Sequence, residues 1–230
     1  MKIVLMGAPG CGKGTQALFV SENYNVCHLS MGRLLRDAVE FKTPSGLRAK
    51  AAVDAGDLVP DDIVFDLLKE GMKKPECKNG YVIEGMPRTL AQAQKMEVAG
   101  IEVDKVINFD VPDGAIIART GGRWIHRPSG RRYHSRFNPP KRDGFDDVTG
   151  EPLIQRADDS RGIAAKRLEI FHKEAPPIKD FYTNKGIFES VTGSLPIKVI
   201  RKKVASLLDP LSKKYALVNL IMTTPQLIKA

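Results

Sequence analysis

The hydrophobic pattern of the chain alternates between short apolar runs and longer stretches in which apolar residues recur at helical spacing. Such short runs are typical of buried strands. Their alternation with helices predicts an α/β fold, a parallel five-stranded sheet flanked by helices on both faces. The predicted strands cover residues 3–6, 26–29, 81–84, 105–110 and 187–191. The predicted helices cover 16–24, 30–39, 60–72, a stretch after Pro112 that carries Arg119 and Arg123, a stretch from 160 that stops before Pro176-Pro177, and 197–208.

Two stretches interrupt this alternation and predict small insertions. Residues 30–59 are small, helical and polar, which predicts a helical flap. Residues 122–159 have few aliphatic side chains and many Gly, Pro, Arg and Asp, which predicts a β-rich lid too poor in apolar residues to fold by itself. The core then comprises 1–29, 60–121 and 160–208. Residues 209–230 form a C-terminal extension, for which a helix packed on the core and a disordered tail are alternatives.

A glycine-rich loop, Gly7-Ala8-Pro9-Gly10-Cys11-Gly12-Lys13-Gly14-Thr15, follows the first strand and precedes a helix. Glycines keep Cβ atoms out of the loop, so backbone N–H groups can converge on phosphate oxygens at the positive end of the helix. A lysine at this position reaches the β and γ phosphates. A tight turn without a ligand is the alternative, but the lysine, the glycine spacing and the flanking elements together favour binding of a nucleoside triphosphate.

A second strand ends in a carboxylate, Glu84, and Gly85-Met86-Pro87-Arg88 follows. A carboxylate that ends a strand beside a phosphate loop can orient Mg2+ directly or through its waters. Gln92 lies one helical turn beyond Arg88, on the same side. Ten arginines fall between Arg119 and Arg167, which predicts a polyphosphate site, with a solvated surface as the alternative.

Composition agrees with a phosphate-binding globular protein. The 230 residues are 42% hydrophobic and 27% charged, and the net charge of +9 fits partners rich in phosphate. We expect no nucleic-acid partner because the excess charge is not confined to one face or tail. Cys11, Cys27 and Cys77 lack metal-ligand spacing, and without a signal peptide they predict reduced thiols and a cytoplasmic location, with import into an organelle left open. No apolar span predicts a membrane helix.

Eight sequence strings occur in one order along the chain: GAPGxGKGTQ, DAGxLV, GxPRT, PSGRxYH, FNPPK, DDVTGE, LxxRxDD and KRL. In these strings the chain resembles the adenylate kinase family, in its long-lid form, over residues 1 to about 208. The resemblance implies a phosphate-loop kinase fold and reversible phosphoryl transfer from MgATP to AMP, which yields two ADP. It also implies a monomer whose partners are ATP, AMP and ADP.

The resemblance implies roles for residues at matching positions. Lys13, Arg123, Arg156 and Arg167 would surround the transferred phosphoryl group, and Arg36 and Arg88 would hold the AMP phosphate. Asp158 and Asp159 would orient arginines or waters of Mg2+, with surface ion pairing as the alternative. The implied ATP contacts are Gly10, Cys11, Gly12, Lys13, Gly14, Thr15, Arg119, Arg123, Arg132, Tyr133 and Leu195. The implied AMP contacts are Met31, Arg36, Asp57, Leu58, Val59, Gly85, Met86, Pro87, Arg88, Gln92, Arg156 and Arg167.

Several positions depart from the family pattern. Many long-lid members bind Zn2+ in the lid through four ligands, whose positions here hold His126, Ser129, Asp146 and Thr149. Because only His and Asp are ordinary zinc ligands, we predict a polar hydrogen-bond network and no structural zinc. Glu84 stands where the family usually has Asp. Met31, Arg33 and Met86 also differ, and we interpret these changes as repacking in preference to an altered acceptor pocket.

Two other functions remain open from the sequence. A kinase of the same chemistry with another specificity, such as a GTP-using AMP kinase or a pyrimidine kinase, is the first, although the long lid counts against the pyrimidine branch. The second is a nucleotide-binding switch without transfer. The second set of arginines and the absence of a guanine-reading Asn-Lys-x-Asp string count against the switch.

Overall fold

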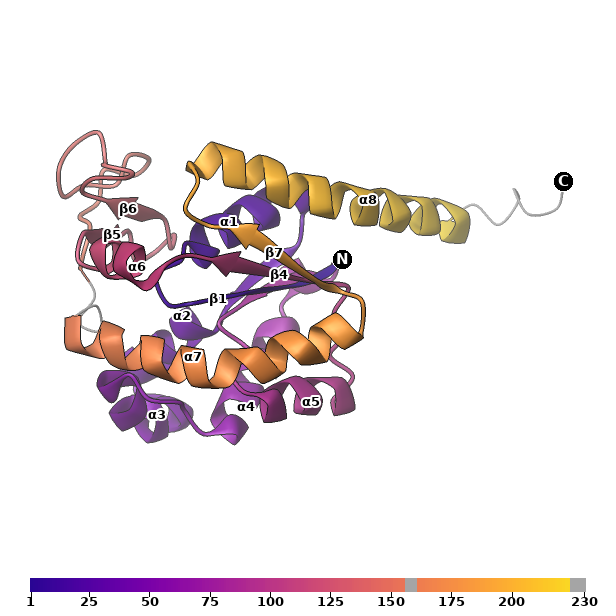
Figure 1. Cartoon of the computed structure of the whole chain (residues 1–230), viewed down its shortest axis with the longest axis horizontal. Helices are drawn as coiled ribbons and strands as arrows, with labels where there is room; N and C mark the ends of the chain where they lie inside the picture. Colours follow the sequence, from indigo (N-terminus) through magenta and orange to yellow (C-terminus); the bar gives the residue numbers. More distant parts are fainter. Residues whose placement is uncertain (156–160, 224–230) are drawn as a thin grey trace, which may run out of the picture.

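A parallel five-stranded sheet forms the centre of the molecule (Figure 1). The computed structural model describes residues 1–155 and 161–223. The strand order is β2-β3-β1-β4-β7, and each neighbouring pair is parallel. This result confirms the predicted fold class. The strands are β1 (Lys2–Gly7), β2 (Cys27–Ser30), β3 (Tyr81–Glu84), β4 (Lys105–Asp110) and β7 (Phe188–Thr192).

Helices cover both faces of the sheet. Because successive side chains of a strand point to opposite faces, Ile3 and Leu5 pack against one layer of helices while Val4 and Met6 pack against the other. The first layer contains α1 (Lys13–Tyr24) and α8 (Ile197–Thr223). The second layer contains α4 (Asp61–Met72), α5 (Leu90–Val98) and α7 (Arg161–Asn184). A single 3-10 turn, η1 (Pro75–Cys77), leads into β3, and α6 (Asp113–Thr120) contacts α7.

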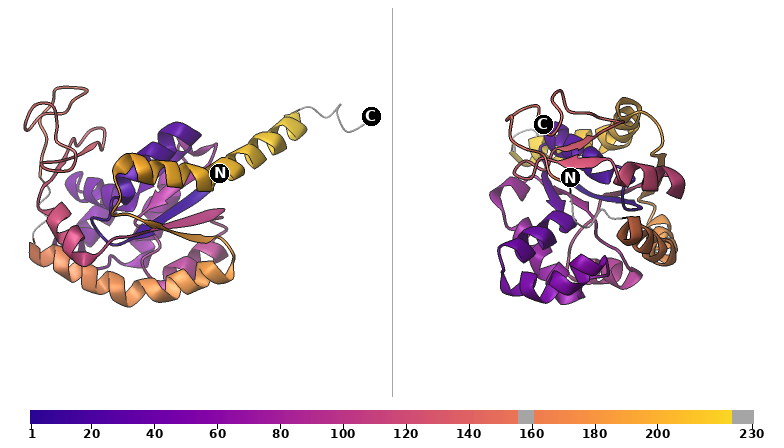
Figure 2. Two further views of the ribbon diagram at one scale, coloured as in Figure 1. Left: turned by 45° about the horizontal axis from the view of Figure 1, so that its top comes forward. Right: turned by 90° about the vertical axis from the view of Figure 1, so that its left-hand side faces the viewer.

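Both predicted insertions have the predicted kind of secondary structure. Between β2 and α4 the chain forms α2 (Met31–Glu40) and α3 (Pro44–Ala55). These two helices cross closely at Gly46, where an added Cβ would lie 1.8 Å from the carbonyl oxygen of Ala38. In the second insertion β5 (Arg123–Ile125) and β6 (Arg132–His134) form an antiparallel pair, and irregular chain with isolated bridges continues to residue 155 (Figure 2).

Two predicted helix boundaries are wrong. We expected α7 to stop before Pro176, but it continues through both prolines to Asn184. Each proline lacks one backbone donor. The helix continues because Ala175, Ile178 and Tyr182 recur on one face and are almost fully buried against the core. The helix after Pro112 was expected to include Arg123, but α6 ends at Thr120 before two glycines, and Arg123 begins β5.

The C-terminal extension begins as part of a helix. α8 continues past Leu208 and Pro210 to Thr223, and its last turns project beyond the sheet (Figure 2). Leu211 and Tyr215 still pack against the core, so the packed-helix alternative is correct as far as Tyr215. Residues 224–230, at the end of the C-terminal extension, lie outside the described residues. Within the described part of the chain, no helix combines the length and apolar character needed to cross a membrane.

The prediction of reduced thiols is wrong for two of the three cysteines. Cys27 and Cys77 form a disulfide, with their Cα atoms 4.8 Å apart, while Cys11 is free and buried. Cys27 and Cys77 lie close together because the backbone N–H of Cys27 donates to the carbonyl of Gly80 at 3.1 Å. This hydrogen bond aligns β2 with the segment that precedes β3. Fifty residues separate the two cysteines, so the sequence alone did not indicate this proximity.

Candidate active site

The glycine-rich loop connects β1 to α1 and is shaped by its own backbone. Gly12 caps the helix with φ of 104°, a left-handed conformation that side chains rarely adopt. The side chain of Lys13 turns back over the loop and donates from Nζ to the carbonyl oxygen of Ala8 at 2.8 Å and to that of Gly7. The first backbone N–H groups of α1, from Lys13 on, lie at the positive end of the helix, which suits an anion.

One cavity of about 570 Å³ joins this loop to both insertions. Most of the predicted site residues line it, although they come from segments far apart in the chain. Those from the loop and the first insertion are Gly10, Cys11, Gly12, Lys13, Gly14, Thr15, Arg36, Asp57, Leu58 and Val59. Those from β3 onward are Glu84, Gly85, Met86, Pro87, Arg88, Arg119, Arg123, Arg132, Tyr133, Arg167 and Leu195. Arg156, Asp158 and Asp159 lie outside the described residues.

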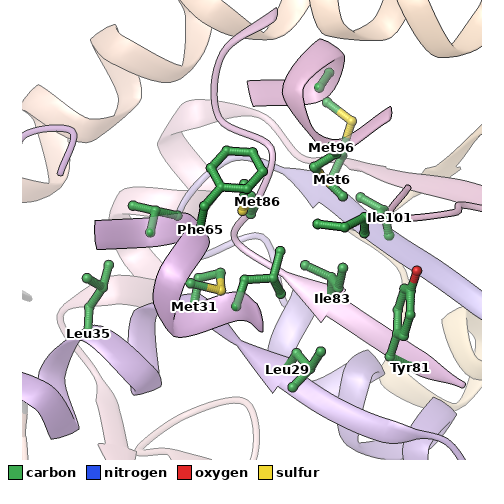
Figure 3. Packing of buried hydrophobic residues seen from close by; sticks show 14 of the residues in the cluster. Met6, Leu29, Met31, Leu35, Phe65, Tyr81, Ile83, Met86, Met96 and Ile101 are labelled. Carbon is green, nitrogen blue, oxygen red and sulfur yellow. The ribbon is translucent and has the colours of Figure 1, made fainter. Parts of the chain in front are cut away.

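Two predicted AMP contacts do not line the cavity. Met31 is fully buried and packs with Met86 and Phe65 inside the core (Figure 3). Met86 also lines the cavity, so our interpretation of the two changes as repacking stays a prediction. Gln92 is also buried: its Nε2 donates to Asp61 Oδ1 at 2.8 Å, and its Oε1 accepts from the backbone N–H of Arg88 at 2.7 Å. Its amide therefore fixes the segment that carries Arg88.

Arg119 connects three parts of the cavity wall. Its Nη1 donates to the carbonyl of Gly193 at 3.0 Å and lies 3.5 Å from that of Cys11. Its guanidinium also lies 5.9 Å from the ring centroid of Phe137, which belongs to the second insertion. The planar guanidinium is thus held between the glycine-rich loop and the turn after β7, in a position where it can stack on a flat ring.

Glu84 ends β3 and lies between His28 and Arg132. His28 Nε2 lies 3.0 Å from its Oε2, and Arg132 approaches both carboxylate oxygens at 3.2 Å. Burial by itself would raise the pKa of the Glu84 carboxyl, but the charge of Arg132 and the contact with His28 outweigh burial and hold that pKa well below its usual range. The group is therefore an anion beside the phosphate loop. A carboxylate accepts up to about four hydrogen bonds, so Glu84 fits a role in binding waters of Mg2+.

Sequence reasoning missed His28 and the position of the Arg132 side chain. The strand register contains the signal for His28: Val82 pairs with His28 and Ser30 pairs with Glu84, so His28 and Glu84 project from the same face of neighbouring strands. The resemblance implied that Arg132 contacts ATP. The structure places its guanidinium beside the phosphate loop, on Glu84.

The second insertion is held together by a polar network, as the sequence predicted. His126 Nδ1 lies 2.7 Å from Ser129 Oγ, and Thr149 Oγ1 donates to Asp146 at 3.0 Å. Asp146 also accepts from Arg131 Nε at 2.8 Å and from the hydroxyl of Tyr133 at 2.9 Å. The hydrogen bonds from Arg131 in particular hold the pKa of Asp146 well below its usual range. The hydroxyl of Tyr133 therefore donates its hydrogen bond inside the second insertion, to Asp146.

Direct contacts connect the two insertions to each other and to the core. Arg33 on α2 donates to the carbonyl of Pro128 at 2.7 Å. Arg127 forms an ion pair with Glu40 at the end of the same helix. Lys166 on α7 pairs with Asp57 at 2.6 Å. These contacts therefore connect the two insertions with each other, and the first insertion with α7, around the cavity.

Fold and site together define a class of protein, a phosphate-loop kinase of nucleoside monophosphates, because one cavity joins the glycine-rich loop to a second group of arginines that includes Arg36 and Arg88. Comparison with known proteins narrows this class. A family model described as adenylate kinase matches residues 5–187. The chain belongs to the adenylate kinase family, and it is an enzyme that catalyses the family reaction, in which ATP and AMP give two ADP.

Individual relatives agree with the family model. The chain is similar to adenylate kinase 3 of Oryza sativa subsp. japonica, with 46% identity over 212 residues, which are 90% of this chain and 88% of the relative. It is 47% identical over 212 residues to adenylate kinase 4 of the same organism, across 90% of this chain and 87% of the relative. Adenylate kinase 4 of Arabidopsis thaliana is 46% identical over 194 residues, which cover 83% and 79% of the two chains.

Proposed function

We propose that the cavity binds ATP on the glycine-rich loop and AMP against the first insertion, with the two phosphate chains end to end between them. The observation that carries this proposal is the continuity of the cavity from Lys13 to Arg36 and Arg88. Residues 30–59 then serve as the AMP flap, 122–159 as the lid over ATP, and 1–29, 60–121 and 160–208 as the core. Residues 209–230 form the C-terminal extension.

In the proposed mechanism, transfer needs no general base. The attacking and leaving oxygens belong to phosphates that are ionised near neutral pH, so catalysis consists of alignment and charge neutralisation. Lys13, Arg123 and Arg167 would neutralise the moving phosphoryl group, and Arg156 with the acids at 158 and 159 would assist them. Mg2+ bound with ATP would offset phosphate charge, with Glu84 as acceptor for its water ligands. Closure of flap and lid would exclude water and so suppress ATP hydrolysis.

In this proposal the bases of AMP and ATP lie against different walls of the cavity. The AMP base would lie against the segment Asp57-Leu58-Val59, while Gln92 would act by positioning Arg88 and not through a free amide. The ATP base would stack on Arg119 beside the turn that contains Leu195. Buried packing of Met31 away from the cavity supports an unchanged acceptor preference for AMP.

The remaining assignments are also proposals. We propose a monomer that contains no structural zinc, because the hydrogen bonds of His126 and Asp146 are made within the lid. We propose no nucleic-acid partner, since many of the arginines line the cavity. A cytoplasmic location stays our prediction, although the argument from reduced thiols no longer supports it.

Steady-state assays with purified protein test the proposed site. ADP formation is measured with ATP or GTP as donor and AMP, CMP or UMP as acceptor, and we expect the pair ATP and AMP to react fastest. The variant Arg88→Met should lower kcat/KM by about 100-fold or more, as expected for a lost transition-state contact of roughly 3 kcal/mol. Arg48→Met removes an equal charge from an exposed position on α3 and serves as the control.

The outcomes separate the alternatives. A preference for GTP would make the chain a GTP-using AMP kinase, and a preference for CMP or UMP would assign it to the pyrimidine branch. A bridged bisubstrate analogue should fill both nucleotide sites with one molecule per chain, and AMP should compete with it. Binding of ATP without competition by AMP and without ADP formation would leave only the nucleotide-binding switch.

A further inference from the structure

The side chain of Arg132 crosses from the lid to the core. Arg132 begins β6 in the second insertion, yet its Nη2 lies 3.2 Å from both oxygens of Glu84 and its Nη1 lies 3.2 Å from Oε1. Both side chains are largely buried, with 19% of the arginine and 13% of the glutamate exposed. A charge-assisted contact that is this well shielded from water is stronger than an ion pair at the rim of the cavity.

The same guanidinium lies against the phosphate loop. A Cβ added at Gly14 would lie 1.3 Å from Arg132 Nη1 and 1.7 Å from Cζ, so the two residues are in van der Waals contact only because Gly14 has no side chain. Gly14 belongs to the first turn of α1, whose amides are placed to bind phosphate. Arg132 therefore occupies the space between the phosphate loop and Glu84.

We propose that Arg132 and the hydrated Mg2+ of the donor compete for Glu84, so that the lid arginine sets how strongly the enzyme requires the metal. This inference rests on the proposed role of Glu84 toward Mg2+. Two cations at one carboxylate repel each other, and the guanidinium already uses both oxygens. Binding of MgATP must move Arg132 away from Glu84, and the free energy of that ion pair is subtracted from the affinity for the metal complex.

His28 makes this exchange possible. It contacts Oε2 of Glu84 from the neighbouring strand β2, so it does not move with the lid. When Arg132 leaves, His28 still fixes the orientation of the carboxylate. His28 is thus a positioning residue, while Arg132 is a competitor that arrives and departs with the lid.

Metal binding measured directly tests the competition. Mn2+ serves as the paramagnetic probe, and its binding to the enzyme saturated with the non-hydrolysable analogue AMP-PNP is followed by electron paramagnetic resonance. We expect Arg132→Met to lower the Mn2+ dissociation constant about tenfold, which corresponds to about 1.4 kcal/mol. The Mg2+ concentration for half-maximal ADP formation should fall in parallel. Arg132→Gln should act in the same direction, and thermal melting shows whether each variant is folded.

Two matched variants complete the design. Arg136→Met removes a charge from an exposed position of the same insertion and should leave metal affinity unchanged. Glu84→Gln should weaken Mn2+ binding, and in its background Arg132→Met should have no further effect.

The results separate the competition by Arg132 from the role of Glu84 toward the metal. If Glu84→Gln weakens Mn2+ binding but Arg132→Met leaves it unchanged or weakens it, the competition is wrong and Arg132 acts as an ordinary phosphate ligand or not at all. If Glu84→Gln leaves Mn2+ binding unchanged, the role of Glu84 toward the metal is wrong, and the inference fails with it.

Discussion

The hydroxyl of Tyr215 fastens the C-terminal half of α8 to the sheet, and its removal should measurably destabilise the protein. It donates to Asp104 at 2.8 Å from Oδ2 and 3.0 Å from Oδ1, and the same carboxylate accepts from the backbone N–H of Lys2 at 2.6 Å. Tyr215→Phe deletes only the hydroxyl, so the ring can keep its packing against the core. A hydrogen bond to a charged group contributes about 1.5–3 kcal/mol, and partial exposure favours the lower end.

The expected loss is therefore about 1.5 kcal/mol, because Asp104 keeps its contact with Lys2 and is not left without a partner. For a chain of this size such a loss lowers Tm by roughly 3–6 °C. Urea unfolding followed by circular dichroism gives the free energy, and a double-mutant cycle with Asp104→Asn isolates the pair. Leu217→Ala, at an exposed position two residues onward on the other side of the helix, is the control and should change stability by less than about 0.5 kcal/mol.

The pH dependence of the same variant gives an independent test. Burial and the hydrogen bond with Asp104 raise the pKa of Tyr215 to about 12 from a usual value of 10.0. A group whose pKa is raised by folding contributes stability below its unfolded pKa and loses that contribution as the pH rises through the folded value. The stability of wild type relative to Tyr215→Phe should thus fall between pH 10 and 12. Equal stabilities at neutral pH and no pH-dependent difference would refute the hydrogen bond between Tyr215 and Asp104.

Three further predictions concern the lid, the donor site and the disulfide. Asp146→Asn should speed amide hydrogen exchange in the lid at neutral pH, and in wild type the same loosening should appear only as the pH falls below about 3.9 toward the lowered pKa of Asp146. Arg119→Met should raise KM for ATP about fivefold, with KM for AMP unchanged, because a cation–π contact contributes about 1 kcal/mol. Reduction of the bond between Cys27 and Cys77 should cost about 2–4 kcal/mol in urea unfolding, whereas Cys27→Ser should make stability insensitive to the reductant.

The parts of the fold that the sequence predicted well are those determined by local patterns. Buried strands, the glycine-rich loop and the helical first insertion each depend on residues near one another in the chain. The errors occur where a distant contact overrides a local preference. Pro176 is a strong local signal for a helix end, but Ile178 and Tyr182 bury enough apolar surface to continue the helix. Cys27 and Cys77 meet only because β2 lies beside β3.

The candidate site shows the same division between backbone and side chains. The spacing of glycines identifies the phosphate loop because glycine allows backbone conformations that the loop needs, whatever the rest of the molecule does. The partner of a long side chain, in contrast, depends on the tertiary structure. Arg132 and Glu84 are separated by 48 residues, and their contact depends on where the lid lies relative to β3. Sequence motifs place Arg132 in the donor site but do not predict which end of the cavity its guanidinium reaches.

The contacts between the second insertion and the rest of the molecule differ in how much free energy they contribute. The ion pair of Arg127 with Glu40 lies at the exposed rim, where such pairs contribute about 0–1 kcal/mol, and the hydrogen bond of Arg33 to the carbonyl of Pro128 is also exposed. The contact between Arg132 and Glu84 is the more buried one and should dominate. Because this contact lies beside the phosphate loop, we expect binding of the donor with its Mg2+ to break it. Under this proposal Glu84 at the end of β3 binds either Arg132 of the lid or the waters of Mg2+ that arrives with the donor, because one carboxylate binds only one of these two cations at a time.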